Sequence, residues 1–285
     1  MGCLISLFFN LDKKNDKHQY KYVKNHYNSD SDSDSDSDNL SYKYGNLNYI
    51  NKKKPIIVSI DGNIGSGKST IVKYLKSNFK EYIKKESGSK LNICILEEPV
   101  NIWNKIVDKK DGKNIIEKYY EDQEKYSFAF QMMAYISRLS QIKEAIDKNC
   151  YDIIITERSI LTDKHIFAKM LYDDNKINDI EYSIYLKWFD EFNDVIDNIK
   201  IVYIKTSPEV SYKRVIKRQR IGENISLDYL KKCHDYHEDI LKENYNIILI
   251  NGNIEADPKI TIDDLYYNMV MNKIYKFIFS DFTLS

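Results

Sequence analysis

One strand–loop–helix segment near residue 60 constrains the fold of this chain more than any other part of the sequence. Residues 56–60 form a short apolar run rich in β-branched side chains, which is typical of a buried strand. The next residues fit the pattern G-x-x-x-x-G-K-[ST], with Gly62, Gly67, Lys68 and Ser69 at its fixed positions. Apolar residues at helical spacing follow. This order predicts a phosphate-binding P-loop inside an α/β domain.

A P-loop binds phosphate mainly through its backbone. Glycines let the chain wrap around an anion, so that successive N–H groups point at phosphate oxygens, and the following helix adds the positive end of its dipole. Lys68 would reach the β- and γ-phosphates, and Ser69 would help to hold Mg²⁺. We therefore predict that ATP or another nucleoside triphosphate binds here with Mg²⁺. The predicted phosphate-binding residues of this loop are Gly62, Asn63, Ile64, Gly65, Ser66, Gly67, Lys68, Ser69 and Thr70.

Composition disfavours several other classes of protein. The chain has 285 residues, which is enough for one α/β domain with a sizeable core and additional segments. Lys and Arg total 43, as do Asp and Glu, whereas a protein that binds nucleic-acid polymers usually carries a strong basic excess. The four cysteines form no C-x-x-C pair, which favours a reducing, cytoplasmic setting and disfavours a zinc site. No apolar run approaches the ~20 residues of a membrane-spanning helix.

The first fifty residues differ from the rest of the chain. Residues 29–38 are five Ser-Asp repeats in a polar context that cannot bury enough apolar surface to offset the entropy of ordering. We predict a disordered extension over residues 1–50 and a folded domain over residues 51–285.

The extreme N-terminus fits the myristoylation pattern M-G-x-x-x-[ST], and Cys3 beside Gly2 offers a second acylation site that would tether the protein to a membrane. The alternative is a chance match to a short, permissive pattern.

Charged residues follow two further apolar strands directly. Residues 91–96 lead into Glu98, and residues 152–156 lead into Glu157 and Arg158. In an open α/β sheet, ligands bind outside the carboxyl ends of the strands. Glu98 is therefore a candidate general base, Glu157 a candidate for organising Mg²⁺, and Arg158 a candidate for neutralising phosphate charge. For Glu98 taken by itself, an acidic residue at a strand end on the surface is the simpler interpretation.

The chain beyond these strands continues to alternate between helical and strand patterns. Residues 114–148 have the periodicity of a helix whose apolar stripe Gln131 and Arg138 interrupt; taken alone, each is interpreted as helix surface. A helical pattern over 160–172 follows the third strand, and residues 200–205 and 246–250 predict the last two strands. Five strands that alternate with helices predict a parallel sheet covered on both faces.

Arginines cluster at the end of the helix after the fourth strand. Residues four apart lie on one helix face, so this cluster would form an arginine-bearing lid that closes over the transferring phosphate. A solvated basic face is the alternative. The last strand ends in a polar turn at the nucleotide edge. The residues of the lid and of this turn, all predicted to bind nucleotide, are Arg214, Arg218, Arg220, Asn251, Gly252 and Asn253.

Six sequence blocks resemble the deoxyribonucleoside kinase family, in particular its deoxycytidine and deoxyguanosine kinase branch, and are similar to the insect multisubstrate kinase. In chain order, the blocks are GNIGSGKST, EEPVNIW, FAFQ, ERSILTDKHIFA, IKTSPEVSYKRVIKRQR and DYLKKCHDYHED. The resemblance covers about residues 55–253 and implies a P-loop kinase fold for the domain over residues 51–285. It also implies a homodimer packed through helices and a role in nucleotide salvage.

The resemblance implies a role for each matching residue. Glu98 would take the proton from the nucleoside 5′-hydroxyl, Arg158 would lie beside that hydroxyl, and Glu157 would organise Mg²⁺. Gln131 would hydrogen-bond the base edge. The residues that complete the nucleoside pocket are aromatic side chains around the base and a pair that holds the sugar 3′-hydroxyl: Trp103, Phe130 and Phe167, and Tyr120 with Glu223.

Base selection depends on two further positions. Arg138 and Asp163 are similar to an Arg–Asp pair in the deoxycytidine and deoxyguanosine kinase branch. Asp163 would accept a hydrogen bond from an exocyclic amino group or ring N–H, and Arg138 would keep it ionised. Thymine offers no amino group and adds a methyl group, so we predict a preference for deoxycytidine or a deoxypurine over thymidine.

Two alternative functions remain open at this point. A thymidylate-type nucleoside monophosphate kinase shares the P-loop, lid and sheet, but its ionised phosphate acceptor needs cationic groups where a hydroxyl acceptor needs a base such as Glu98. A membrane-tethered nucleotide-binding module without activity would have no need to keep four residues together: Lys68, Glu98, Glu157 and Arg158. The loop between Arg220 and Leu227 is about one residue shorter than in the family, which weakens the assignment of Glu223.

Overall fold

The computed structural model describes residues 54–192, 199–220, 223, 225–240, 246–254 and 262–280. The predicted extension over residues 1–50, with Gly2, Cys3 and the Ser-Asp repeats, lies outside this range, so its disorder and its acylation stay predictions. All that follows concerns the described part of the domain over residues 51–285.

A five-stranded parallel sheet organises the domain, as predicted. Its strand order is β2-β3-β1-β4-β5, so the chain passes from one side of β1 to the other between β3 and β4. This reversal of direction is the place where α/β sheets bind ligands. The predicted strands are all present, with ends shifted by up to two residues. They are β1 (Ile56–Gly62), β2 (Ile93–Leu96), β3 (Ile153–Glu157), β4 (Lys200–Lys205) and β5 (Ile247–Asn251).

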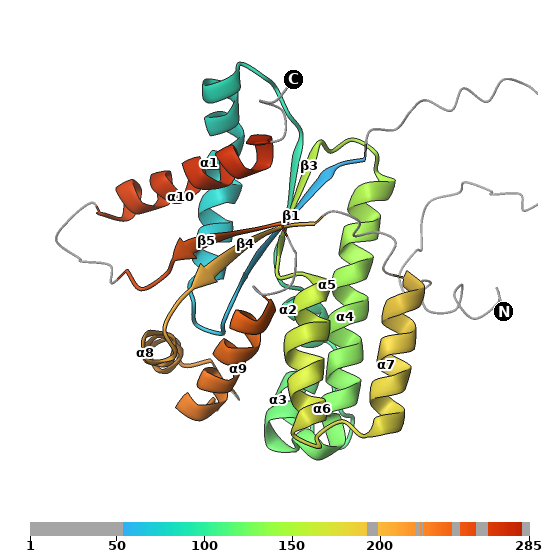
Figure 1. Ribbon diagram of the computed structural model, residues 1–285. Coiled ribbons are helices and arrows are strands. Elements are labelled where there is room, and N and C mark those ends of the chain that lie inside the picture. Colours follow the sequence, from blue (N-terminus) through green and yellow to red (C-terminus); the bar gives the residue numbers. More distant parts are fainter. Residues whose placement is uncertain are drawn as a thin grey trace, which may run out of the picture. The chain divides into compact units, whose positions relative to one another are not determined.

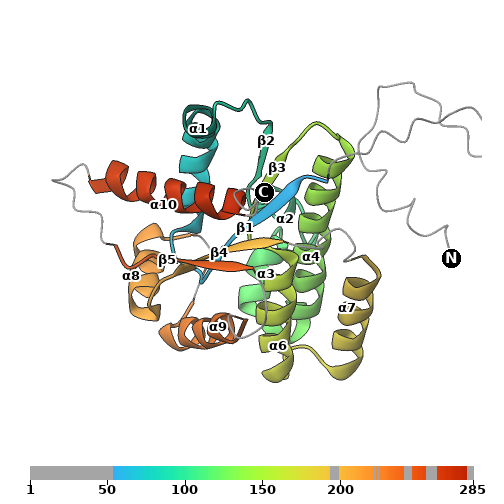
Figure 2. The same cartoon turned by 45° about the horizontal axis from the view of Figure 1, so that its top comes forward.

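Helices cover both faces of this sheet. Figures 1 and 2 show α1 and α10 on one face and α4 on the other, with α7 beyond α4. The helical segments, including one π-helical stretch named η2, are α1 (Lys68–Ser87), α2 (Val100–Trp103), α3 (Ile115–Glu121), α4 (Gln123–Asp147), α5 (Ile160–Thr162), η2 (Asp163–Ala168), α6 (Lys169–Asp173), α7 (Asp179–Phe192), α8 (Pro208–Arg218), α9 (Leu227–Ile240) and α10 (Ile262–Phe279).

The two faces of the sheet have separate cores. The inner side chains of α1 recur every three or four residues, among them Leu75, Phe79 and Ile83, and they pack with Ile274 of α10 against the sheet. On the other face, Tyr135 of α4 packs with the α7 aromatics and Ile201. Strands that are buried on both faces need near-continuous apolar sequence, which is why β1 and β3 are rich in Ile and Val.

Three helical predictions need correction. The single helix predicted over residues 114–148 is two helices, because Asp122 ends α3 and its side chain accepts a hydrogen bond from Lys125 N at the start of α4. The segment 160–173 is helical, but its middle is the π-helix η2. The third correction is the helix α7, which was not predicted because exposed apolar residues on its surface obscure the helical periodicity.

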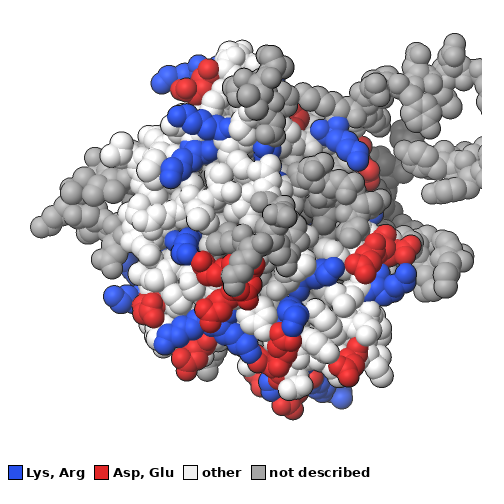
Figure 3. Space-filling view, in the orientation of Figure 1, with Lys and Arg blue, Asp and Glu red and all other residues white. Residues whose placement is uncertain are grey.

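Charges of both signs are interspersed on the surface. Among the described residues on the face drawn in Figure 3, Lys and Arg side chains lie beside Asp and Glu side chains and do not merge into a continuous basic area. This agrees with equal totals of basic and acidic residues in the sequence. In the described part of the chain, no helix combines the length and the apolar character needed to cross a membrane.

Candidate active site

The P-loop connects β1 to α1 as predicted. Gly67 has a positive φ of 99° and forms the N-cap of α1. Gly65, with φ of 78°, passes so close to α8 that a Cβ there would lie 2.5 Å from Ser211 O. Asn63 Nδ2 donates a hydrogen bond of 2.8 Å to Leu230 O, which ties the loop to α9. The loop is therefore held between two helices and adopts backbone angles that favour glycine.

Lys68 extends back over the loop from the first turn of α1. Its Nζ donates a hydrogen bond of 2.7 Å to Asn63 O, and the side chain is buried. Burial, helped by the nearby Arg158 guanidinium, lowers the pKa of Lys68 to about 7. A phosphate dianion at this position would favour the protonated amine, so Lys68 suits the binding of a polyphosphate.

The two predicted Mg²⁺ residues are in direct contact. Ser69 Oγ, in the first turn of α1, donates a hydrogen bond of 2.6 Å to Glu157 Oε1 at the end of β3. Mg²⁺ prefers hard oxygen ligands and usually keeps several waters and substrate phosphates in its coordination shell. Within the described ranges, no cluster of three His, Cys, Asp or Glu side chains could hold a metal alone. A hydroxyl and a carboxylate beside a P-loop fit an ion that arrives with a nucleotide.

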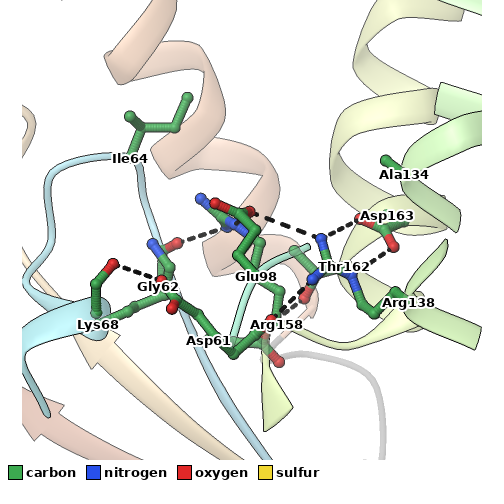
Figure 4. Close-up of polar contacts among 12 residues, drawn as sticks. Asp61, Gly62, Ile64, Lys68, Glu98, Ala134, Arg138, Arg158, Thr162 and Asp163 are labelled. Carbon is green, nitrogen blue, oxygen red and sulfur yellow. Dashed lines mark hydrogen bonds and ion pairs between the residues drawn. The ribbon is translucent and has the colours of Figure 1, made fainter. Parts of the chain in front are cut away.

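Glu98 lies between two buried arginines (Figure 4). Its Oε1 is 3.5 Å from Arg158 Nε and 3.7 Å from Arg138 Nη2, and about a fifth of its side chain is exposed. Burial alone would raise the pKa of this carboxyl group, but nearby cations outweigh burial and lower the pKa below its ordinary value. These cations are Arg158, Arg138, Lys68 and Arg220. Glu98 is therefore an ionised acceptor for a hydroxyl proton.

A cavity of about 830 Å³ joins the P-loop to Arg138 and Asp163. Its walls come from the P-loop, the ends of β2 and β3, and α2, α3, α4, η2, α8 and α9. Every predicted site residue lines this cavity except six. The six that do not line it are Gly62, Asn63, Ser66, Asn251, Gly252 and Asn253.

Arg138 and Asp163 form a buried ion pair at one end of this cavity. Arg138 Nε is 2.9 Å from Asp163 Oδ2, and Nη2 is 3.4 Å from Oδ1 (Figure 4). Burial raises the pKa of Asp163, and the Arg138 guanidinium opposes that rise. Gln131 is also buried, and its Oε1 has no hydrogen-bond partner among the described residues. The interpretation of Gln131 and Arg138 as helix surface is therefore wrong.

Aromatic side chains form other walls of the cavity. Trp103 is buried, donates a hydrogen bond of 2.9 Å from Nε1 to Ser137 Oγ, and packs edge-on against Phe130 with 5.4 Å between ring centroids. On a different wall, the Arg158 guanidinium carbon lies 4.8 Å from the centre of the Phe167 ring. The three predicted aromatics therefore line one pocket although they come from α2, α4 and η2.

Tyr120 and Glu223 line the cavity, but Glu223 is also engaged by the predicted lid. Arg218 binds both carboxylate oxygens of Glu223, with 2.8 Å between Arg218 Nε and Oε2. Burial, and next the Glu223 charge, raise the pKa of Tyr120 well above its ordinary range. Glu223 thus pairs with an arginine of the predicted lid, and its charge acts on the Tyr120 hydroxyl.

Arg214 is held by the backbone, unlike Arg218. Its guanidinium donates hydrogen bonds to three carbonyl oxygens, those of Ser66, Gly252 and Ile254. The polar turn at the end of β5 therefore accepts hydrogen bonds from Arg214, and its residues do not line the cavity. A Cβ on Gly252 would overlap Thr206 Oγ1, which explains the glycine in this turn.

Comparison with known proteins agrees with this geometry. The family model described as deoxynucleoside kinase matches residues 58–279. The chain belongs to the deoxynucleoside kinase family. It is 35% identical over 247 residues to a Fowlpox virus (strain NVSL) protein named probable deoxycytidine kinase, covering 83% of this chain and 93% of that protein. It is 29% identical over 246 residues to Homo sapiens deoxycytidine kinase, covering 78% and 90%, and 30% identical over 199 residues to Xenopus laevis mitochondrial deoxyguanosine kinase, covering 64% and 71%.

These matches confirm three predictions about this deoxynucleoside kinase: the family with its deoxycytidine and deoxyguanosine kinase branch, the α/β class, and the enzyme class of an ATP-dependent deoxynucleoside kinase. Neither the monophosphate kinase nor the inactive binding module is favoured by them.

Several residues at the site of the kinase were not predicted from the sequence. Ala134 lines the cavity from α4, and its helical spacing from Gln131 and Arg138 could have identified it. Tyr119 and Tyr229 also line the cavity, with their hydroxyl oxygens 3.3 Å apart. Asp61, which is buried at the end of β1, carried no signal beyond its place before the P-loop.

Proposed function

We propose that this kinase transfers the γ-phosphoryl group of ATP or another nucleoside triphosphate to the 5′-hydroxyl of a deoxynucleoside, and favours deoxycytidine or a deoxypurine over thymidine. The observation that carries this proposal is the buried Arg138–Asp163 pair in the same cavity as Glu98 and the P-loop. Arginine is always protonated in proteins, so it favours the carboxylate form of Asp163. A fixed carboxylate accepts a hydrogen bond from an exocyclic amino group, which thymine lacks. Gln131 Oε1, which lacks a partner among the described residues, would bond the same base edge.

Glu98 would act as the base in this reaction. Proton transfer to a positioned carboxylate requires it to be ionised and within hydrogen-bond reach of the 5′-hydroxyl. The surrounding cations keep Glu98 ionised, and Arg158 would fix both Glu98 and the attacking oxygen. Tyr120 and Glu223 would hold the sugar 3′-hydroxyl, while Trp103, Phe130 and Phe167 would enclose the base.

The P-loop and the arginines of α8 would bind the triphosphate. Lys68 would be protonated when it binds the β- and γ-phosphates. The lid formed by Arg214, Arg218 and Arg220 would neutralise the charge of the transferring group. Ser69 and Glu157 would hold Mg²⁺, which when bound supplies further neutralisation of phosphate charge. The product would be a deoxynucleoside monophosphate, as in nucleotide salvage.

Phosphorylation of the four natural deoxynucleosides by the full chain, each with ATP and Mg²⁺, tests this proposal. Turnover of deoxycytidine or a deoxypurine without turnover of thymidine is the expected result. Preferential turnover of thymidine would contradict the role of Asp163 and leave the kinase reaction intact. Turnover of monophosphates alone would contradict the role of Glu98 as a base and favour a thymidylate-type kinase.

The exposed face of α7 supports the predicted homodimer. Ile180 is 74% exposed, Ile184 and Trp188 about 40%, and Ile136 of neighbouring α4 is 38% exposed. Contiguous exposed apolar residues on a helix pair mark interaction surfaces. We expect Ile180→Glu combined with Ile184→Glu to yield a monomer in sedimentation velocity, whereas Ile216→Glu on α8 should leave a dimer. A wild-type monomer at micromolar concentration would contradict the dimer.

We also propose that the extension over residues 1–50 is dispensable for catalysis and can tether the kinase to membranes. Removal of residues 1–50 should leave kcat within about twofold, since these residues lie outside the matched region 58–279. After eukaryotic expression, the mass of the N-terminal peptide would show a myristoyl group on Gly2 and an acyl group on Cys3. An unmodified Gly2 would contradict the tether.

A further inference from the structure

Asp61 is a buried carboxylate that the proposed reaction does not use. It lies in β1, is 3% exposed and does not line the active-site cavity. No ion pair is formed by Asp61 within the part of the chain that the structure describes. Its two oxygens instead accept four hydrogen bonds from neutral groups: Ser59 Oγ (2.8 Å), Ser159 N (3.1 Å), Ser159 Oγ (3.2 Å) and Thr162 Oγ1 (2.6 Å). Burying a charge is costly, so a carboxylate at this position needs an explanation.

Three of these four bonds hold the segment that follows Arg158. Ser159 is the N-cap of α5 and Thr162 is the last residue of that helix. Asp61 therefore fastens the start of the α5–η2 segment to β1, the strand that leads directly into the P-loop. Figure 4 shows Asp61 and Thr162 beside Arg158.

Arg158 itself has an unfavourable backbone conformation. Its φ is 65°, a left-handed value that is strained for a non-glycine residue and persists only when its surroundings enforce it. Two hydrogen bonds hold the backbone of Arg158 in this conformation. Arg158 N donates to Ile60 O at 3.1 Å, and Thr156 Oγ1 donates to Arg158 O at 2.7 Å. The next backbone N–H, that of Ser159, donates to Asp61. The side chain then reaches Gly62 O at 2.8 Å and lies 3.5 Å from Glu98.

We propose that Asp61 is a positioning residue that holds Arg158 in its left-handed conformation and thereby aims the guanidinium at Glu98 and the 5′-hydroxyl. The charge of Asp61 strengthens its hydrogen bonds to Ser159 and Thr162, because bonds to an ionised acceptor are stronger than neutral ones. A neutral residue of the same shape would hold the turn less firmly. The inference concerns the same reaction as the proposed function and rests on it for its kinetic consequences.

The test compares Asp61→Ala and Asp61→Asn in the full chain. Asp61→Ala removes every acceptor, so kcat for deoxycytidine should fall by about 100-fold, the effect of misplacing a group by about 1 Å, while the KM values for deoxycytidine and ATP change less than about threefold. Asp61→Asn keeps one oxygen for Ser159 N and should restore part of the loss. Ser59→Ala removes a donor that does not contact the Arg158 turn and should stay within about threefold of wild type.

A double-mutant cycle separates positioning from general destabilisation. If Asp61 acts through Arg158, Asp61→Ala should lower kcat less than about threefold in an Arg158→Ala background. The same 100-fold loss in both backgrounds would overturn the proposal, as would an unchanged kcat in Asp61→Ala. If Asp61→Ala does not fold, Asp61→Asn takes its place in the cycle.

A structural measurement keeps the inference testable if the proposed function fails. In a crystal structure of Asp61→Asn or Asp61→Ala, Arg158 should leave the left-handed region or lose its contact with Gly62 O. An unchanged Arg158 would overturn the inference. Failure of the wild-type kinase to phosphorylate any deoxynucleoside would count against the proposed function alone.

Discussion

The two ends of the active-site cavity hold their charged side chains in different ways. At the end that we propose selects the base, charges pair with other side chains: Arg138 with Asp163, and Glu98 with both Arg138 and Arg158. At the phosphate end, Lys68 is held by the carbonyl oxygen of Asn63, and Arg214 is held by three backbone carbonyl oxygens. The first end therefore consists of mutually neutralised charges, whereas Lys68 and Arg214 at the other end are held by dipoles. Arg218 of the predicted lid is the exception, because it pairs with Glu223.

This difference indicates that the two ends of the cavity have different functions. A buried ion pair is costly to break, because the partner left behind is an uncompensated charge. The buried pair of Arg138 and Asp163 therefore keeps one fixed arrangement of polar groups, which is complementary to one base edge. A carbonyl dipole holds a cation more weakly than a phosphate does, so the cations at the other end can exchange a carbonyl for a phosphate oxygen. We infer that base selection resides at the first end, whereas the second binds any triphosphate.

The largest effect should come from Glu98→Gln, which removes the proposed base and keeps the side-chain shape. We expect kcat to fall by roughly 10²–10⁴-fold, the range for losing a positioned general base, with ATP affinity little changed. Glu97→Gln is the matched control, because Glu97 is exposed and pairs only with Lys76 among the described residues. Steady-state kinetics and ATP titration measure both. Equal losses in the two variants would contradict the assignment.

Breaking the ion pair should be the next largest effect. Arg138→Met leaves Asp163 buried without its cation, so the free energy of unfolding should fall by about 3–5 kcal/mol. Combining Arg138→Met with Asp163→Ala removes both charges and should recover part of that loss. Urea denaturation of the single and double variants gives the comparison. A double variant less stable than the single one would show that the pair is not energetically coupled.

Proton uptake on ATP binding should show that Lys68, at the phosphate end, exchanges a carbonyl oxygen for a phosphate oxygen. With a pKa of about 7, Lys68 is mostly neutral at pH 8 without nucleotide, and bound phosphate raises that pKa. ATP binding at pH 8 should therefore take up about one proton. ATP binding at pH 6 should take up far less, because the Lys68 amine is already protonated at that pH. Calorimetry in buffers of different ionisation enthalpy measures the uptake. Lys68→Met should abolish it and Lys76→Met should not; equal uptake at both pH values would contradict the assignment.

The smallest effect should come from the aromatic wall. Trp103→Phe removes the hydrogen bond from Nε1 to Ser137 Oγ and should cost about 1 kcal/mol of unfolding free energy. Ile216 is 55% exposed and lies outside the predicted dimer face on α7, so Ile216→Val should stay within about 0.5 kcal/mol of wild type in denaturant unfolding. A larger loss in Ile216→Val than in Trp103→Phe would contradict this placement.

The phosphate end was easier to predict from the sequence than the base-selecting end. Phosphate recognition depends on local backbone, so the loop from Gly62 to Ser69 carries its own signal, and a buried strand before it places it at the sheet edge. Gln131 and Arg138 interrupt an apolar stripe, and only tertiary contacts show that they are buried. The resemblance to the family supplied their roles where periodicity did not.

Other features depend on contacts between distant segments. The π-helix η2 has no sequence signature, since it is defined by which carbonyl each N–H reaches. Asp61 meets Ser159 and Thr162 only because β1 pairs with β3, a register that sequence periodicity does not specify. Glycine-rich turns and strand ends are therefore predictable from the sequence, while buried polar networks become visible only in the fold.

The most direct test of the division between the two ends is the ratio of kcat/KM for deoxycytidine to kcat/KM for thymidine, measured with ATP on wild type and on the Arg138→Met/Asp163→Ala double variant. We predict that the wild-type ratio favours deoxycytidine by at least about 100-fold and that the double variant lowers it by at least about tenfold, because buried polar groups no longer penalise thymine. The KM for ATP should stay within about threefold. A ratio that the double variant leaves unchanged would contradict the claim that this ion pair selects the base.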